Sequence, residues 1–449
     1  MSNRPNGSAP LFIGLLIAAA VVGVAFGPGW MAIVTRMETS PVMPLPGADP
    51  SADYLMGLIW AFGTIVAVLL IGGLLRFRGP LLTVWIAKLF VDLTIMLLYD
   101  YTYGVDPDGY YLNASTPGFT WDGFTMGQGT LNTRTLTWLH YAFVNSSFNA
   151  TRLTFSLIGL AGLFLVYRAA VLCTGREGPR VFFAFAFVPS VLFWSSILGK
   201  DPIAFFGISA YVFGVVAWHT LNQNRYLLWM AAGLLVAVYI RMWFAPILLI
   251  PLGLLGWMRS EGFAKRSIFV ALGLVGVLLS PLILKESIGV DLFQEGELLE
   301  TADTMARVFP GGGSSLEVPD LATPGQIAAF APLGVFTVFF RPLPGEVNNV
   351  FGVLTGIENA FLLILTIRAI YRTKLRDLKE PLVAWALAAL LIWAGVYSIA
   401  SFQNLGTLSR YKLQIMPIFL GLLYYLGRKR DVVLVEPPRQ RPILTQVRS

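Results

Sequence analysis

A short acidic and aromatic stretch, DPDGYY at residues 106–111, carries the side chains best suited to chemistry in this chain. Asp106 and Asp108 could each accept a proton from a hydroxyl group, which is the task of a general base. Aromatic side chains of the same polar segment could stack on sugar rings; they are Tyr110, Tyr111, Trp121 and Trp138. Asp-Pro-Asp-Gly is also a good turn-forming sequence, so turn formation explains the two aspartates equally well.

Charged residues recur in four further stretches beside apolar runs: LGKDP, YIRMW, FRPLPGE and NLGTLSRYK. Cations in such positions can bind phosphate and stabilise it as it departs. The candidate substrate- and phosphate-binding residues are Lys200, Asp201, Arg241, Arg341, Glu346, Arg410, Tyr411 and Lys412. Simpler explanations are snorkelling of the lysines to lipid headgroups and a surface pair between Arg341 and Glu346. Arg241, in an apolar hairpin, is the hardest to explain without an anionic partner.

His140 lies in TWLHYAFVN and is a further candidate for the catalytic base. A lone histidine among aromatic residues is more often a packed side chain. No HExxH, CxxC, Walker or GxSxG pattern is present. We therefore expect no dedicated metal site and assign no cofactor. A divalent cation could still enter the site together with a phosphate group.

Composition indicates an integral membrane protein. Hydrophobic residues make up 56% of the 449 residues and charged residues 13%, whereas soluble domains carry about 25% charge. The net charge of +7 comes from basic residues in short connections between apolar runs, where they report topology. The first expected partner is thus the lipid bilayer, and no nucleic acid is expected.

Twelve apolar runs predict an all-α, polytopic membrane fold, since about 20 residues cross the hydrocarbon core. They lie at 11–28, 54–75, 80–99, 152–172, 181–198, 202–219, 226–240, 243–258, 266–284, 347–369, 381–400 and 410–427. A shorter apolar segment, GQIAAFAPLGVFTVFF, is bounded by prolines. We expect it to form an interfacial or re-entrant helix.

Lysine and arginine residues predict the orientation of these spans. They collect in the connections that are cytoplasmic if the N-terminus is cytoplasmic, as the positive-inside rule requires. Both termini then lie in the cytoplasm, and the long connections near 29–53, 100–151 and 285–346 are extracytoplasmic. We expect one transmembrane domain over residues 1–430 and a cytoplasmic tail over 431–449.

All five charged stretches fall on the extracytoplasmic face of this topology. Carboxylates in a loop and cations at the membrane boundary suit transfer from a lipid-anchored phosphate donor, whose headgroup lies at that boundary. Bacterial sugars reach the outer leaflet as polyprenyl phosphates or diphosphates. We interpret the chain as a glycosyltransferase of the bacterial inner membrane that elongates a cell-surface polysaccharide, with Asp106 or Asp108 as the base.

Three stretches resemble motifs of bacterial polytopic polysaccharide polymerases and related GT-C-type glycosyltransferases: VPSVLFWSSILGKDP, FRPLPGE and NLGTLSRYKLQIMPIFL. The resemblance implies a helical membrane fold, undecaprenyl-linked glycan donors, a glycan acceptor and a catalytic extracytoplasmic face. It also implies that Asp106 or Asp108 is the aspartate of the extracytoplasmic loop that these enzymes carry, and that Lys200, Arg341 and Arg410 contact the phosphate. Proteins of a polysaccharide export system would be further partners.

Other functions stay open at this level. A transporter or flippase of a lipid-linked or anionic solute needs polar residues within the membrane, and Lys88, Asp92 and Glu358 lie inside predicted spans. Lys88 and Asp92, four residues apart, are most simply a structural ion pair. A ligase that joins a finished glycan to lipid or protein would use the same face as a polymerase, and a non-catalytic scaffold would leave Arg241 unexplained.

Overall fold

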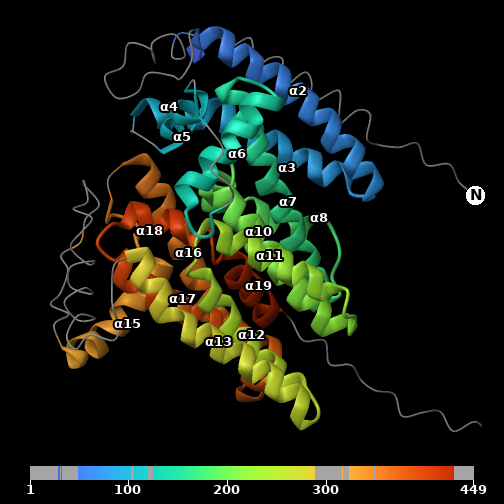
Figure 1. The fold of residues 1–449 in the computed structure, drawn as a ribbon, viewed down its shortest axis with the longest axis vertical. Coiled ribbons are helices and arrows are strands. Elements are labelled where there is room, and N and C mark those ends of the chain that lie inside the picture. The colour runs from blue at the N-terminus through green and yellow to red at the C-terminus, as the bar shows by residue number, and fades with distance from the viewer. Residues whose placement is uncertain are drawn as a thin grey trace, which may run out of the picture.

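The computed structural model describes residues 49–102, 106–116, 118–119, 125–288, 323–347 and 349–428, with residues 29, 30, 32 and 316. The described residues form helices and no strand, which confirms the all-α prediction (Figure 1). The predicted span at 11–28, most of the 29–53 connection, Trp121 and the tail at 431–449 lie outside the described residues.

The helices of the first half are α2 (Pro50–Leu74), α3 (Arg78–Phe90), the π-helical segment η1 (Val91–Ile95), α4 (Met96–Thr102), α5 (Asp106–Ser115), α6 (Gly129–Phe143), α7 (Phe148–Thr174), α8 (Pro179–Ala186), α9 (Pro189–Trp194) and α10 (Lys200–Leu221). Those of the second half are α11 (Tyr226–Ile240), α12 (Phe244–Arg259), α13 (Phe263–Ile288), α15 (Pro324–Phe340), α16 (Val350–Arg372), the 3₁₀ segment η2 (Leu375–Lys379), α17 (Pro381–Ala400), α18 (Leu405–Lys412) and α19 (Met416–Gly427).

Seven helical segments of the described chain are long and apolar enough to cross a membrane. They are Pro50–Leu74, Arg78–Asp100, Phe148–Thr174, Lys200–Leu221, Phe263–Ile283, Val350–Arg372 and Pro381–Ala400. Each coincides with a predicted span, so the chain is a polytopic membrane protein by this criterion. The number of twelve spans and the cytoplasmic position of both termini stay predictions.

Two predicted spans are broken into shorter helices. The run at 181–198 forms α8 and α9, because Val188 precedes Pro189 and adopts an extended conformation with ψ of 119°. The run at 410–427 forms the end of α18 and all of α19, with a turn at residues 413–415 between them. Sequence hydropathy reported both runs as continuous because it does not register these interruptions.

Polar contacts join α2 and α4 to the N-terminus of α7. Asp53 of α2 accepts hydrogen bonds from the backbone N–H of Phe148 (2.7 Å) and from Asn149 Nδ2 (2.6 Å). Arg152 forms a fully buried ion pair with Asp100 of α4 and donates from Nη1 to the Asp92 carbonyl oxygen (3.2 Å). That carbonyl belongs to the π-helical segment, where the widened helix frees backbone groups for side-chain donors.

The centre of the bundle is α10, which packs against α7 and α11 and is buried on most sides (Figure 1). Small residues allow the close approach of α10 and α11: a Cβ added at Gly233 would lie 2.2 Å from the backbone nitrogen of Tyr211. Helix α10 begins at Lys200 and Asp201, so the packing of its apolar length fixes the position of two predicted site residues.

Replacing Arg152 by Met should lower the free energy of unfolding by about 3–5 kcal/mol, because Asp100 would stay buried without its partner. The double variant Asp100→Asn/Arg152→Met should recover part of this loss. Arg168→Met is the control, since the Arg168–Glu177 pair (3.3 Å) is exposed and should contribute less than about 1 kcal/mol. Equal losses for the two single variants in denaturant unfolding of the reconstituted protein would contradict the assignment.

Candidate functional site

Arg410 of α18 connects three segments that are far apart in the sequence. Its Nε lies 2.5 Å from Asp201 Oδ2 at the start of α10, and its Nη1 lies 2.8 Å from Asp106 Oδ2 at the start of α5. Burial lowers the pKa of Arg410, but the two carboxylates outweigh burial and hold the pKa above its usual value. The guanidinium therefore stays charged and holds α5, α10 and α18 together.

Local sequence places these three side chains. Asn404 caps α18 by accepting a hydrogen bond from Thr407 N (2.9 Å), and Arg410 lies in the last turn of that helix. Asp201 lies in the first turn of α10, where a carboxylate is favoured by the helix dipole. Asp106 begins α5, so the predicted turn sequence in fact opens a helix of ten residues.

Two further cations, Lys200 and Arg241, lie near these three residues. We call the whole set the Arg410 cluster; its members are Asp106, Lys200, Asp201, Arg241 and Arg410. Lys200 Nζ donates to Thr130 Oγ1 (2.9 Å) and lies 5.8 Å from the centre of the Tyr110 ring. Lys200 also interacts electrostatically with the other four members. The cluster thus holds three cations and two carboxylates, which leaves one positive charge uncompensated within it.

Arg241, like Lys200, forms no ion pair with a described residue. Its side chain is 5% exposed and is held by aromatic groups: the Tyr397 hydroxyl lies 3.3 Å from Nη1, and the Tyr411 ring centre lies 4.3 Å from Cζ. The Trp243 ring centre lies 5.3 Å from the same Cζ. The Arg241 guanidinium is thus largely buried and is contacted by aromatic rings and a hydroxyl group, with no carboxylate paired to it. Such a cation is suited to bind an anion.

The structure separates the two aspartates of the acidic stretch. Asp106 is 53% exposed and faces Arg410. Asp108 is 7% exposed and lies near the Asp100–Arg152 ion pair, and its Oδ1 has no hydrogen-bond partner among the described residues. Burial, and after it the charge of Asp100, raise the pKa of Asp108 to about 7 against the opposing effect of Arg152. The two carboxyl groups therefore lie in different environments although they are only two residues apart on one helix.

A largely apolar groove of about 440 Å³ lies beside the Arg410 cluster, and we call it the α16 groove. Its walls come from η1, α4, α9, the start of α16 and the start of α18; lining residues include Tyr99, Phe193, Trp194, Phe351, Leu354 and Ser409. Trp194 joins the two features, since its ring centre lies 5.7 Å from Arg410 Cζ. The groove is thus an apolar surface that adjoins a positively charged cluster at Trp194.

Glu358 supplies a carboxylate to the wall of this groove. It is 6% exposed and accepts hydrogen bonds from the Ser190 backbone nitrogen (2.7 Å) and hydroxyl (2.6 Å). Lys412, which interacts electrostatically with Glu358, is 1% exposed and donates to Asn359. Lys412 is therefore buried beside the groove and does not extend to the surface.

The Arg341–Glu346 pair forms a self-contained loop beside the groove. Arg341 Nε lies 2.8 Å from Glu346 Oε1, and the backbone nitrogen of Leu343 donates to Glu346 Oε2 (2.7 Å). Pro342, from the same loop, lines the groove. Glu346 neutralises Arg341 within the loop, and Arg341 is not a member of the Arg410 cluster.

His140 and Tyr111 hold helices together. Both ring nitrogens of His140 lie 2.9 Å from threonine hydroxyls of α7, Nδ1 from Thr151 and Nε2 from Thr154, and burial lowers its pKa. The Tyr111 hydroxyl donates to the Ser146 carbonyl oxygen and its ring is packed in the core. Trp138 packs against Phe119 and Phe143. Among the described residues predicted to stack on sugar rings, Tyr110 is the one in contact with the Arg410 cluster.

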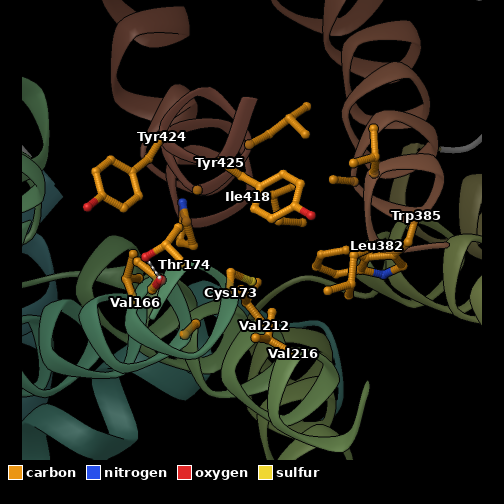
Figure 2. A pocket seen from close by; sticks show the side chains of 17 residues that line it. Val166, Cys173, Thr174, Val212, Val216, Leu382, Trp385, Ile418, Tyr424 and Tyr425 are labelled. Atoms are coloured by element: carbon orange, nitrogen blue, oxygen red, sulfur yellow. Dashed lines mark hydrogen bonds between the residues drawn. The ribbon is translucent and has the colours of Figure 1, made fainter. Parts of the chain in front are cut away.

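A second cavity, of about 50 Å³, lies between α7, α10, α17 and α19 (Figure 2). Figure 2 shows Cys173, Val212, Val216, Leu382 and Ile418 around it, so its wall is apolar. It offers neither a carboxylate nor a cation, and the hydroxyl of Tyr425 donates to Glu380 (2.6 Å). This cavity lacks the groups that acid–base chemistry requires.

No protein-family model, curated protein or solved structure matches the chain. Within the described part of the chain, no group of three or more His, Cys, Asp and Glu side chains is arranged to hold a metal ion. The candidate site therefore stands on its own geometry.

Sequence reasoning missed the aromatic and polar residues that support the site. Tyr397 accepts hydrogen bonds from Trp243 Nε1 (2.9 Å) and Arg241, and donates to Gln414 (2.6 Å). Trp194 lies within the stretch VPSVLFWSSILGKDP but is not among the predicted site residues. Their signal was weak, because a tyrosine near the end of an apolar run and a tryptophan beside a serine pair are common in membrane proteins.

The raised pKa of Asp108 gives the stability of the protein a defined pH dependence. The pKa in the folded state is about 7, above the value of about 3.9 in an unfolded chain, so the neutral carboxyl stabilises the fold at acidic pH and this contribution is lost as the pH rises to about 7. The Tm of the unmodified protein should therefore fall relative to that of Asp108→Asn between about pH 5 and about pH 8. A difference in Tm that does not change with pH would contradict the assignment.

Proposed function

We propose that the chain is a membrane glycosyltransferase that takes its sugar from a polyprenyl-linked phosphate or diphosphate donor. The observation that carries the proposal is the α16 groove, an apolar groove that adjoins the Arg410 cluster at Trp194. A polyprenyl phosphate has the same order of parts, an apolar chain that ends in a negatively charged head. The groove would hold the chain and the cluster would hold the phosphate.

The cluster contains the groups that departure of a phosphate requires. When the bond between the sugar and the phosphate oxygen breaks, negative charge develops on that oxygen, and fixed cations lower the energy of this state. Arg241 has no ion pair within the described structure and is free to take up a phosphate. Arg410 and Lys200 lie beside it and would share the charge.

Asp106 is the residue best placed to accept the proton. It is half exposed and adjoins the cation cluster, whereas Asp108 faces the interior of the bundle. In the proposed step the acceptor hydroxyl oxygen attacks the anomeric carbon of the sugar, its proton passes to Asp106, and the bond to the phosphate oxygen breaks. The products are the new glycosidic bond and the polyprenyl phosphate or diphosphate.

The proposal includes a location and partners. The Arg410 cluster would face the extracytoplasmic side of a bacterial inner membrane, where a lipid-linked glycan donor and a glycan acceptor meet. Elongation of a cell-surface polysaccharide is the activity that we favour, and ligation of a finished glycan would use the same groups. Proteins of a polysaccharide export system would receive the product.

Transport of an anionic or lipid-linked solute is the second candidate. It is favoured by buried charges in the bundle beneath Asp108, where Lys88 donates to Ser195 and Ser196 and Asp92 lies near Arg152. Intramembrane charges of this kind often mark ion or proton paths. A carrier would move the lipid-linked glycan between leaflets without forming a glycosidic bond.

The experiment that separates these functions uses the protein in lipid nanodiscs with an extract of polyprenyl-linked glycans. A glycosyltransferase lengthens the glycans and releases polyprenyl phosphate or diphosphate. In vesicles, a carrier changes the leaflet of the glycan lipid and releases neither product. Absence of both activities in folded protein would contradict both assignments.

Variants of the cluster should lower the transferase rate in a graded way. Asp106→Asn should reduce kcat by roughly 10²–10⁴-fold, as expected for loss of a general base. Arg241→Gln should reduce kcat/KM by roughly 10²-fold, because a cation that stabilises the departing phosphate is lost. Arg341→Gln is the matched control at the same end of the bundle and should retain most of the rate, since Glu346 already neutralises Arg341.

The release of polyprenyl phosphate provides the measurement for all three variants, at protein levels checked by size-exclusion chromatography. If Asp106→Asn and Arg241→Gln behave like Arg341→Gln, the Arg410 cluster is not the catalytic site.

A further inference from the structure

A third cavity, of about 580 Å³, lies at the end of the bundle opposite the Arg410 cluster. It is formed where α2 ends, α3 begins, α7 ends and α8 begins (Figure 1). Three arginines line it, namely Arg76, Arg78 and Arg168, with Glu177 as the acidic residue. We call this feature the arginine pocket. It takes no part in the glycosyl transfer proposed above.

The floor of the arginine pocket is a cluster of packed aromatic rings. Phe77 stacks on Tyr167 with ring centres 4.8 Å apart, and Phe182 meets both rings edge-on at 5.4 and 5.6 Å. Phe164 also lines the pocket. The arginines therefore surround a fixed apolar base, and the pocket is more than a set of surface charges between two spans.

The arginines carry more positive charge than the pocket neutralises. Arg168 Nη1 lies 3.3 Å from Glu177 Oε1, and both side chains are substantially exposed. Neither Arg76 nor Arg78 forms an ion pair with a described residue. Three guanidinium groups and one carboxylate leave an excess of two positive charges around the cavity, which suits a ligand with a phosphate group.

The position and surroundings of the pocket identify the source of that phosphate. The pocket adjoins the ends of three helices that are long enough to cross a membrane, so it lies at the depth of lipid headgroups. Leu75 lines the pocket, and the neighbouring Leu74 is 85% exposed on α2. Acyl chains could lie against this apolar surface, whereas a soluble phosphate compound would leave it uncovered.

We propose that the arginine pocket binds the headgroup of an anionic glycerophospholipid, with its acyl chains along the exposed face of α2. Arg76, Arg78 and Arg168 contact the phosphate, and the aromatic floor supports the glycerol region. A basic pocket between the ends of membrane helices is a recurrent form of site for anionic lipids.

Gly73 offers a test that leaves every charge in place. A Cβ added at Gly73 would lie 2.6 Å from Nη2 of Arg78, so the Arg78 guanidinium must move if this residue becomes alanine. Gly73→Ala should therefore weaken lipid binding by displacing one phosphate contact. A purely diffuse attraction between a basic surface and an anionic membrane would be unaffected.

The experiment measures the Tm of detergent-solubilised protein as a function of added phosphatidylglycerol. Phosphatidylcholine and inorganic phosphate serve as the neutral-lipid and free-anion arms. Phosphatidylglycerol should raise the Tm, and the other two should not. The triple variant Arg76→Gln/Arg78→Gln/Arg168→Gln should need at least about tenfold more phosphatidylglycerol than the unmodified protein for the same rise in Tm. The concentration that Gly73→Ala needs should lie between those of the unmodified protein and the triple variant.

The charge-matched control is Arg225→Gln/Arg376→Gln/Lys379→Gln, which removes three exposed cations at the same end of the bundle. It should respond to phosphatidylglycerol as the unmodified protein does. The proposal is overturned if this control loses as much response as the triple variant, if Gly73→Ala responds normally, or if inorganic phosphate replaces the lipid. If the triple variant does not fold, the exposed single variant Arg168→Gln is compared with Arg225→Gln under the same criteria.

Discussion

The ion pair between Arg410 and Asp201 is the interaction on which the candidate site depends. Asp201 is fully buried at the start of α10, and an unpaired charge there would cost several kcal/mol. Arg410 satisfies it, and in doing so fixes α18, a helix of only eight residues, against the central helix of the bundle. The same guanidinium also pairs with Asp106 and lies over the Trp194 ring. The Arg410 side chain therefore holds α5, the start of α10 and the Trp194 wall of the α16 groove in place relative to one another.

Charge in this molecule is arranged in two ways that differ in their consequences. Within the bundle, Arg152 and Asp100 form a fully buried pair of matched charge, and such a pair holds helices together without attracting a ligand. In the Arg410 cluster and the arginine pocket the cations outnumber the carboxylates, and both features adjoin apolar surface. An excess of positive charge beside an apolar surface is the condition that an amphipathic anion satisfies. The two features lie at opposite ends of the bundle, so the proposed substrate and the proposed structural lipid do not compete.

Much of the helical architecture and several site residues followed from the sequence, for identifiable reasons. Apolar length predicts helices such as α2, α7 and α10 because the bilayer imposes it. Asp106, Lys200, Asp201, Arg241 and Arg410 were all predicted as site residues, and the structure brings them together. The sequence could not distinguish Asp106 from Asp108, because their difference arises from which side of α5 faces Arg410. It also gave no sign that both nitrogens of His140 bond to α7, or that Lys412 is buried, since these depend on helix packing. The α16 groove is formed by segments that are far apart in the sequence, so it has no local sequence signature.

The central claim is that the α16 groove and the Arg410 cluster together bind a lipid-linked phosphate. The most direct measurement is a cryo-electron microscopy structure of the protein in nanodiscs with a polyprenyl phosphate. The account predicts a continuous apolar chain in the groove, past Trp194, with its phosphate within hydrogen-bond distance of Arg241 or Arg410. A phosphate bound elsewhere, with the groove occupied by bulk lipid or by side chains, would contradict it.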